Sequence, residues 1–258
     1  MIRFFDSHAH VYDKAYDGTR EQMLKDVFRS VDYLVCPSED LETSQLSVSL
    51  AQAYPGIYAA VGFHPHRAAG MTEEALSDIE EMVQSSPKVV AIGEIGLDYF
   101  RLKSEKEDQL SCFERQLALA DIVDLPVIIH ARDSFGDTLA VLKKYKSPRM
   151  RGVIHCFSGS YEMAKELIKL GFYISFAGSV VFPGSVRLKA VAKQIPLERL
   201  LIETDSPYLT PPPFRGRINT PVHVSLVAEE LARLKECSVE TIAKATYDNA
   251  CTLFQLKK

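Results

Sequence analysis

Hydrophobic residues gather in short, compact runs that alternate with longer amphipathic stretches. Eight runs are rich in apolar and β-branched residues, and near-continuous hydrophobicity of this kind is typical of parallel strands buried on both faces. They cover Arg3–Phe5, Asp32–Cys36, Ile57–Gly62, Val89–Gly93, Pro126–His130, Gly152–His155, Phe172–Phe176 and Leu200–Glu203. The pattern therefore predicts eight strands separated by helices.

The stretches between these runs repeat their apolar residues at helical spacing. The clearest series are Leu110, Phe113, Leu117 and Ala120, then Met163, Leu167 and Leu170. Thr19 to Gln22 predicts a capping box at the start of another helix, and two or three helices are expected after Val222. Alternations repeating about every 30 residues favour a closed parallel (β/α)8 TIM barrel, formed as a single domain by residues 1–258. An open doubly wound sheet is the alternative, although the dinucleotide-binding Gly-x-Gly-x-x-Gly sequence is missing after the first run.

Composition narrows the class of partner and the compartment. The 258 residues carry 30 Lys and Arg against 34 Asp and Glu, a net charge of −4, which argues against a protein that coats duplex nucleic acid or an anionic membrane. The five cysteines are odd in number and include no Cys-x-x-Cys pair, so a reducing compartment is expected. No apolar run approaches about 18 residues, and the first residues do not resemble a signal peptide. The sequence predicts a cytoplasmic protein without a membrane partner, and a monomer is compatible with it.

Histidines mark the carboxyl ends of the predicted strands, where TIM-barrel enzymes assemble their active sites. Six of the seven lie at such ends or a few residues beyond: His8, His10, His64, His66, His130 and His155. His8 and His10 stand two residues apart in an extended segment, so their imidazoles share a face and can chelate one divalent cation. Taken alone, this pair is equally well interpreted as two surface histidines on a turn.

Two carboxylates join the histidines at the same end of the predicted barrel. Glu94 follows the fourth run and Asp205 follows the eighth. Buried charges need partners, and four histidines with two carboxylates on one rim are typical of a metal site. The residues expected to bind metal are His8, His10, Glu94, His130, His155 and Asp205.

Other rim residues have two interpretations each. We expect His64 to face the site and contact substrate, and His66 to lie outside it. Arg132 is expected to bind a substrate phosphate, and the alternative is an ion pair with a nearby carboxylate. Tyr99, Phe100 and Phe182 are expected near the rim, with core packing favoured over stacking on unpaired bases.

Taken in order, the motifs of this chain resemble the TatD family of metal-dependent deoxyribonucleases, within the amidohydrolase-like barrels. They include Phe4-Phe5-Asp6-Ser7-His8-Ala9-His10, Gly62-Phe63-His64-Pro65, Gly93-Glu94-Ile95-Gly96-Leu97-Asp98, His155-Cys156-Phe157-Ser158-Gly159 and Glu203-Thr204-Asp205-Ser206-Pro207. The resemblance implies a site for two divalent metal ions, with Mg, Zn and Mn as candidates. It implies that His8, His10 and Asp205 hold one ion. His130 and His155 would hold the other, and Glu94 would bridge both.

The resemblance and the expected metals favour an enzyme that hydrolyses phosphodiester bonds in DNA. Two cations lower the pKa of a water and clamp phosphate oxygens, and Asp205 is placed to take the proton from that water, with Glu94 as the second catalytic residue. The family implies 3′-to-5′ exonuclease activity, and the modest charge favours single-stranded DNA over a duplex. The alternative is an amidohydrolase-type enzyme that cleaves an ester, lactone, cyclic amide or aminoacyl ester. A third hypothesis is a non-catalytic barrel whose metal supports a binding surface.

Overall fold

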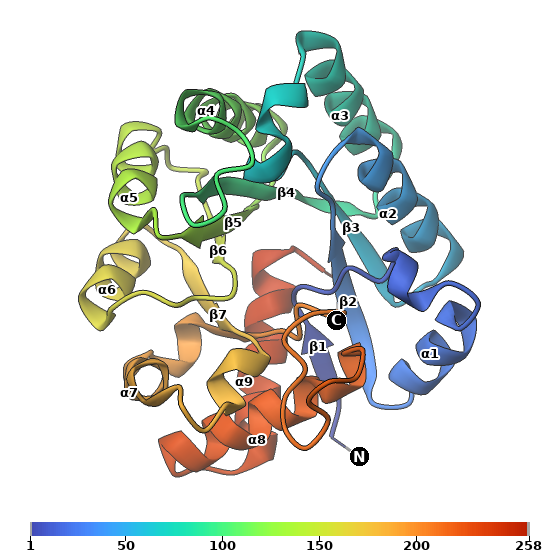
Figure 1. The fold of residues 1–258 in the computed structure, drawn as a ribbon, viewed down its shortest axis with the longest axis vertical. Helices are drawn as coiled ribbons and strands as arrows, with labels where there is room; N and C mark the ends of the chain where they lie inside the picture. The colour runs from blue at the N-terminus through green and yellow to red at the C-terminus, as the bar shows by residue number, and fades with distance from the viewer. Residues whose placement is uncertain (1, 257–258) are drawn as a thin grey trace.

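The eight predicted strands form one parallel sheet in the computed structural model, which describes residues 2–256. The strands pair in chain order from β1 to β8, and the sheet curls into a ring with helices outside it (Figure 1). They are β1 Phe4–Asp6, β2 Val31–Pro37, β3 Ile57–Val61, β4 Val89–Asp98, β5 Val127–Arg132, β6 Gly152–Ile154, β7 Tyr173–Phe176 and β8 Leu200–Ile202. The predicted (β/α)8 barrel is confirmed, and the open doubly wound sheet is wrong.

Hydrogen bonds between the first and last strands close the ring. The amide of Ser7 donates to the carbonyl of Ile202 at 3.0 Å, and the amide of Asp205 donates to the carbonyl of His8 at 2.9 Å. Both bonds lie just beyond the carboxyl ends of β1 and β8. They therefore fix the position of His8 relative to Asp205.

Helices follow the strands around the outside of the ring. They are α1 Arg20–Val27, α2 Leu41–Ala53, α3 Glu73–Ser85, α4 Lys106–Val123, α5 Phe135–Lys144, α6 Tyr161–Lys169, α7 Val186–Gln194, α8 Val224–Lys235 and α9 Val239–Leu253. Short 3-10 turns are η1 Lys14–Tyr16, η2 Pro65–Gly70, η3 Gly178–Val181, η4 Leu197–Arg199 and η5 Pro221–His223. The first apolar series identified in the sequence falls in α4, and the second falls in α6 except for Leu170, which caps the end of that helix. The helices expected after Val222 are α8 and α9. Across residues 2–256, no helix is both long enough and apolar enough to span a bilayer.

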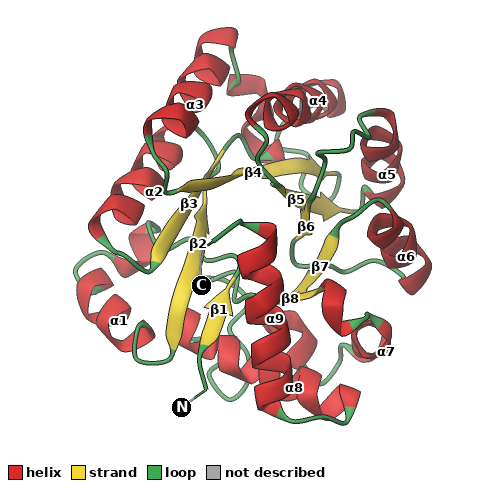
Figure 2. Ribbon diagram, turned by 180° about the vertical axis from the view of Figure 1, so that it is seen from behind, coloured by secondary structure: helices red, strands yellow, loops and turns green. Residues whose placement is uncertain are grey.

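The C-terminal helix covers one end of the barrel. Inward-facing residues of the strands, such as Phe5, Val35 and Ile128, form a buried cluster with the end of α9, where Phe254 stacks on Phe5 at 6.0 Å between ring centroids. Seen from behind, α9 crosses in front of the strand ring beside β1 and β8 (Figure 2). The cluster also includes Tyr33 from the start of β2, so α9 covers the end at which the strands begin. The predicted metal ligands lie at the opposite end, where the strands stop.

β4 is longer than the predicted strand Val89–Gly93, because it continues to Asp98 and is buried throughout. Its register against β5 shifts in the segment that contains Glu94, and irregularities of this kind re-aim a side chain. Gly96 has a φ of +134°, and a Cβ built there would lie 2.0 Å from the carbonyl oxygen of His130. Only glycine fits such a position, which lets β4 and β5 approach each other beside the site.

The predicted capping box at Thr19 is wrong, although α1 does begin at the next residue, Arg20. The Thr19 hydroxyl donates to the carbonyl of Tyr16 at 3.2 Å, within the preceding turn, and caps no helix amide. A capping box occurs at α2 instead. There the Asp40 carboxylate accepts from the Thr43 amide at 2.9 Å, and the Thr43 hydroxyl accepts from the Asp40 amide at 2.9 Å.

Candidate metal centre

Five strands bring the six predicted ligands together at the carboxyl end of the barrel. Two histidines follow β1 directly, one glutamate lies within β4, one histidine lies within β5, one histidine follows β6, and one aspartate lies three residues beyond β8. These residues are His8, His10, Glu94, His130, His155 and Asp205. All are buried except His130 and Asp205, which are half-buried. Three groups of these side chains, one of which also includes His64, place their ligand atoms within 4.8 Å of one another.

Glu94 stands at the centre of the group. Its Oε1 lies 2.8 Å from Nδ1 of His130 and 2.8 Å from Nε2 of His155. Its Oε2 lies 3.3 Å from Nε2 of His8 and 3.7 Å from Nε2 of His10. Each carboxylate oxygen therefore faces a different pair of imidazoles.

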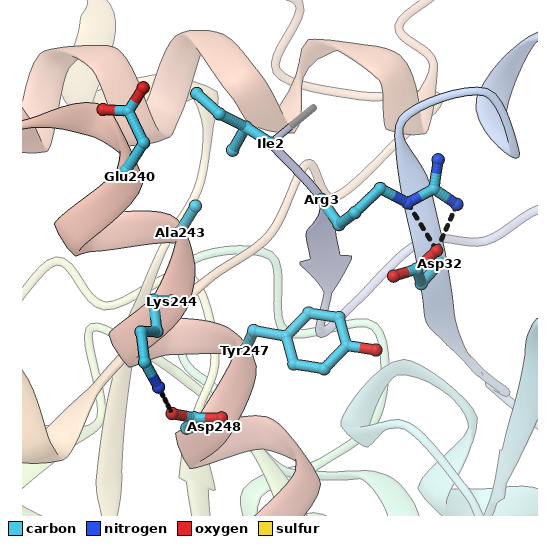
Figure 3. A pocket seen from close by; sticks show the side chains of 8 residues that line it. All are labelled: Ile2, Arg3, Asp32, Glu240, Ala243, Lys244, Tyr247 and Asp248. Carbon is cyan, nitrogen blue, oxygen red and sulfur yellow. Dashed lines mark hydrogen bonds and ion pairs between the residues drawn. The ribbon is translucent and has the colours of Figure 1, made fainter. Parts of the chain in front are cut away.

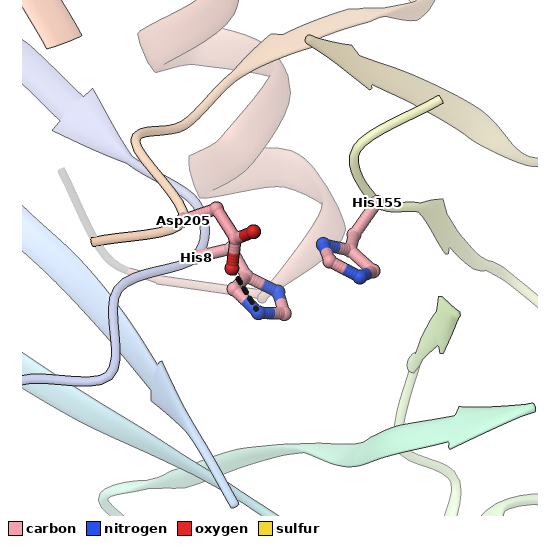
Figure 4. A group of neighbouring side chains, drawn as sticks. All are labelled: His8, His155 and Asp205. Carbon is pink, nitrogen blue, oxygen red and sulfur yellow. Dashed lines mark ion pairs between the residues drawn. The ribbon is translucent and has the colours of Figure 1, made fainter. Parts of the chain in front are cut away.

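The donor set of His8, His10 and Asp205 fits a divalent cation. The Nε2 atoms of His8 and His10 are 3.1 Å apart, and they lie 3.6 Å and 3.5 Å from Oδ1 of Asp205. Two imidazole nitrogens bound at 2.0–2.1 Å to one tetrahedral zinc would be about 3.3 Å apart. Figure 4 shows Asp205 aimed at His8, while the ring of His155 lies stacked on that of His8 at 3.9 Å between centroids.

The two central carboxyl groups are ionised at neutral pH. Burial by itself would raise the pKa of Glu94, but the surrounding imidazoles outweigh it and hold that pKa well below its usual range. Burial opposes ionisation of Asp205 too, yet the hydrogen bond with His10 and the neighbouring imidazoles lower its pKa. The pKa of His155 is raised well above its usual value, because Glu94 and Glu203 overcome the effect of burial. One buried and one half-buried anion surrounded by imidazole nitrogens suit metal binding, which releases protons from the ligands.

Buried polar contacts hold the ligands in place from behind. The carboxylate of Glu203 is fully buried, accepts from the amide of Cys156 at 2.6 Å and lies 3.3 Å from Nδ1 of His155. It therefore orients His155 so that Nε2 faces Glu94. On the other side, the Asp6 carboxylate accepts from the amide of His8 at 3.2 Å and from the hydroxyl of Thr204 at 2.6 Å. Burial raises the pKa of Asp6 to about 8, although these hydrogen bonds oppose the shift.

Sequence reasoning missed Asp98 and misplaced His66. Oδ2 of Asp98 lies 3.1 Å from Nε2 of His130 and 2.9 Å from Nε2 of His66, so one carboxylate contacts both rings. The expectation that His66 lies outside the site is wrong, since it lines the same cavity as the ligands. Asp98 was visible in the motif that contains Glu94. It lies four residues after Glu94, and this spacing did not place the two carboxylates in one site, because β4 was expected to end at Gly93.

Tyr12 is a further contact that the sequence did not reveal. Its hydroxyl lies 3.1 Å from Nδ1 of His10, the nitrogen on the far side of the ring from the metal centre. His10 is thus oriented by a phenol, whereas His130 and His155 are oriented by carboxylates. A tyrosine two residues beyond a ligand has no motif of its own, so only the structure shows this contact.

Five of the six predicted ligands, all except the fully buried His8, line a cavity of about 360 Å³ whose wall is rich in cations and also contains Glu39. Four basic side chains contribute to that wall: Arg67, Arg101, Lys103 and Arg132. The guanidinium of Arg132 lies 3.9 Å from the ring centroid of Phe100, which is 59% exposed. Core packing, the favoured interpretation of Phe100, is therefore wrong. His64 also lines the cavity, and its Nε2 lies 3.4 Å from Oε1 of Glu94. Burial lowers the pKa of His64 to about 3, so this imidazole is neutral.

A larger cavity, of about 540 Å³, lies at the other end of the barrel (Figure 3). It is lined by Ile2, Arg3, Asp32, Glu240, Ala243, Lys244, Tyr247 and Asp248. Its opposite charges pair with one another, as Arg3 does with Asp32 and Lys244 with Asp248. This lining gathers no set of metal-ligating side chains, so size does not identify the reactive site here.

Comparisons with known proteins identify the family and the fold. Residues 5–255 match the family model described as TatD related DNase. The metal-dependent hydrolase YabD of Bacillus subtilis is 45% identical, covering 98% of this chain and 99% of its own length. A protein of Edwardsiella piscicida named 3′-5′ ssDNA/RNA exonuclease TatD is 36% identical over 86% of this chain and 88% of its own. The crystal structure of YjjV, a TatD homologue from Escherichia coli K12, superposes with a TM-score of 0.93 at 32% identity and covers 99% of both chains.

Proposed function

Because this chain belongs to the family of TatD-related DNases and is a metal-dependent hydrolase, we propose that it hydrolyses phosphodiester bonds, removing nucleotides from the 3′ end of single-stranded DNA. The observation that carries this proposal is the composition of one cavity, with metal ligands at its floor and four cationic side chains in its wall. Ligands of this kind serve metal-assisted hydrolysis, and arginine suits phosphate recognition. The exonuclease name of the Edwardsiella relative supports the same substrate class.

We assign two divalent metal ions to the site. His8, His10 and Asp205 would hold one, His130 and His155 would hold the other, and Glu94 would contribute to both. The split of the Glu94 oxygens between the two histidine pairs supports this assignment. When bound, such cations supply a water of lowered pKa and positive charge for the phosphate oxygens. Imidazole-rich donors favour Zn or Mn on ligand softness, while Mg is the hard alternative.

The side chains of this chain then divide the remaining work. Asp205 is the base that takes the proton from the attacking water, since its carboxylate is ionised and only half-buried at the cavity. Glu94 holds the two histidine pairs at a fixed distance from each other, because each of its oxygens faces one pair. Arg132 binds a non-bridging phosphate oxygen from the cavity wall, and neutral His64 contacts the substrate from the β3 side.

The shape and charge of the molecule favour an unpaired strand. At a net charge of −4, attraction for DNA must come from the cavity and not from a broad basic face. A cavity enclosed by the loops of a barrel mouth admits a strand end more easily than a duplex. We place this activity in the cytoplasm, where thiols stay reduced, because the five cysteines form no disulfide within residues 2–256.

The test uses one oligonucleotide labelled at its 5′ or 3′ end, single-stranded or paired, with protein loaded with Mg²⁺, Mn²⁺ or Zn²⁺. We expect stepwise shortening of the 5′-labelled single strand and loss of this activity in Asp205→Asn. The panel also contains a lactone, a cyclic amide and an aminoacyl ester. Inert DNA together with metal-dependent turnover of one of these compounds would replace the proposal with the amidohydrolase-type alternative. No turnover of any compound would favour a binding protein.

A further inference from the structure

A second, smaller cavity adjoins the candidate metal centre on the β8 side. It measures about 280 Å³ and is lined by Phe182, Leu209, Thr210, Arg215 and Gly216. Leu209 also lines the cavity that holds the metal ligands, so the two cavities meet at this residue. Neither the ligand set nor the proposed reaction uses this second cavity.

Two loops build the second cavity, and their backbones are in direct contact. One loop follows β7 and contains Gly178, and the other follows β8 and contains Leu209. A Cβ built on Gly178 would lie 2.1 Å from the carbonyl oxygen of Leu209 and 3.4 Å from Pro211. Glycine therefore permits an approach that any side chain would prevent.

Hydrogen bonds and a ring contact hold the β8 loop in one shape. The hydroxyl of Thr210 donates to the carbonyl of Arg217 at 2.7 Å, and the side-chain amide of Asn219 donates to the carbonyl of Tyr208 at 2.6 Å. Further along the loop, the ring of Phe214 stacks on a histidine of η5 at 4.5 Å between centroids. The cavity is thus formed in advance, which lowers the entropic cost of binding.

The lining combines an aromatic face with a cation. The guanidinium of Arg215 lies 4.3 Å from the ring centroid of Phe182, which is half-buried, and Arg215 is exposed. On β5, across the ring of strands from β8, Arg132 lies over Phe100 in the same way. Arg132 lines the same cavity as the metal ligands, and this cavity shares Leu209 with the cavity of Phe182 and Arg215. An aromatic face with a cation beside it is the arrangement that binds a stacked base and its phosphate without reading the sequence.

We propose that the Phe182–Arg215 cavity binds the second nucleotide from the 3′ end, while the terminal nucleotide occupies the metal cavity beside Phe100 and Arg132. In the structure the exposed guanidinium of Arg215 covers one face of the Phe182 ring. On binding, Arg215 moves from this face to the phosphate on the 5′ side of the nucleotide, and the base stacks on the face that Arg215 leaves. The strand passes over Leu209 between the two positions. This inference rests on the proposed function, and it makes the enzyme prefer oligonucleotides over single nucleotide esters.

The experiment compares a short single-stranded oligonucleotide with thymidine 5′-p-nitrophenyl phosphate, using Mn²⁺-loaded protein. The ester carries one nucleoside and has no second base. In Phe182→Ala and Arg215→Ala, we expect KM for the oligonucleotide to rise about tenfold, and the preference for it over the ester to fall by the same factor. Phe182→Tyr keeps the aromatic face and should restore the preference. Arg29→Ala is the matched control, because it removes the same charge after α1, at the end of the barrel where the strands begin.

The outcomes separate this inference from the proposed function. If the wild type cleaves the oligonucleotide but neither cavity variant changes its preference, the second-nucleotide site is overturned and the nuclease assignment stands. The same holds if activity on both substrates falls in parallel, because a site for the second base cannot act on the ester. If the wild type cleaves neither substrate, the proposed function fails and takes this inference with it. Thermal melting of each variant confirms that it is folded.

Discussion

Replacing Glu94 with glutamine tests the two-metal arrangement most directly. Glutamine keeps the volume of the side chain and one carbonyl oxygen, but its NH₂ group can neither coordinate a metal ion nor accept a hydrogen bond. Since each Glu94 oxygen faces a different pair of imidazoles, only one pair keeps an oxygen partner, and the negative charge is lost. We expect the variant to bind one divalent ion where the wild type binds two.

The size of the effect on the rate follows from distance and charge. The charge lost from Glu94 would act on the cations that it holds and not on His8, since burial lowers the pKa of His8 and leaves this imidazole neutral. Two unit charges roughly 3.3 Å apart interact by about 5 kcal/mol at an effective dielectric constant of 20. If this interaction is made in the transition state, kcat/KM falls by about 10³- to 10⁴-fold. Folding without metal should change little, because the amide remains hydrogen-bonded among the imidazoles.

The assay combines Mn²⁺ titration calorimetry, oligonucleotide turnover and thermal melting of the metal-free protein. Glu39→Gln is the control, since Glu39 lines the same cavity but is not among the potential metal-ligand groups of residues 2–256. It should keep both ions and most of the activity. Two ions and near-normal turnover in Glu94→Gln would refute the bridging role.

Three further results are expected. Glu203→Gln should weaken metal binding by about 10- to 100-fold in calorimetry, because the variant holds the ring of His155 less firmly in its orientation. Unchanged affinity would refute this. Gly96→Ala should destabilise the protein by about 1–3 kcal/mol in urea unfolding, since its Cβ would meet the carbonyl of His130, whereas Gly136→Ala, with open space and a helical position, should not destabilise it. Burial lowers the pKa of His223, so its protonation is less favourable in the folded than in the unfolded protein. His223 therefore does not reduce the free energy of unfolding above about pH 6.5, and it reduces that free energy increasingly as the pH falls below this value. Urea unfolding at pH 7.5 and pH 5 should show a smaller loss in His223→Gln than in the wild type, and equal losses would contradict this reasoning.

The barrel could be predicted because each strand is marked by its own short apolar run and the same pattern repeats along the chain. Each buried parallel strand is a compact apolar run, and such runs recur at nearly constant spacing. Strand ends were less well defined, and the case with consequences is β4. Its apolar alternation passes through Glu94 and two glycines, which a pattern of hydrophobicity interprets as the end of a strand.

The convergence of the six predicted ligands on one rim could be predicted, because their residue types are rare and fall at equivalent places in a repeating fold. The contacts around the ligands could not, since they depend on which way a side chain turns after the strand ends. His66 lies in a 3-10 turn and reaches Asp98 across 32 residues, and Tyr12 turns back on His10. The helix cap predicted at Thr19 failed for the same reason, because the Thr19 hydroxyl donates to the nearby carbonyl of Tyr16 and not to the helix.

The closure of the barrel between β1 and β8 has a consequence for how the protein is made. Asp6 and Thr204, whose hydrogen bond ties the two ends of the site together, are separated by 198 residues. A ribosome adds about 5–20 residues each second, so roughly 10–40 s pass between the appearance of the first ligands and the last. During that interval His8 and His10 have neither Asp205 nor β8 beside them. A nascent chain therefore cannot bring the six predicted ligands together until most of its length has left the ribosome.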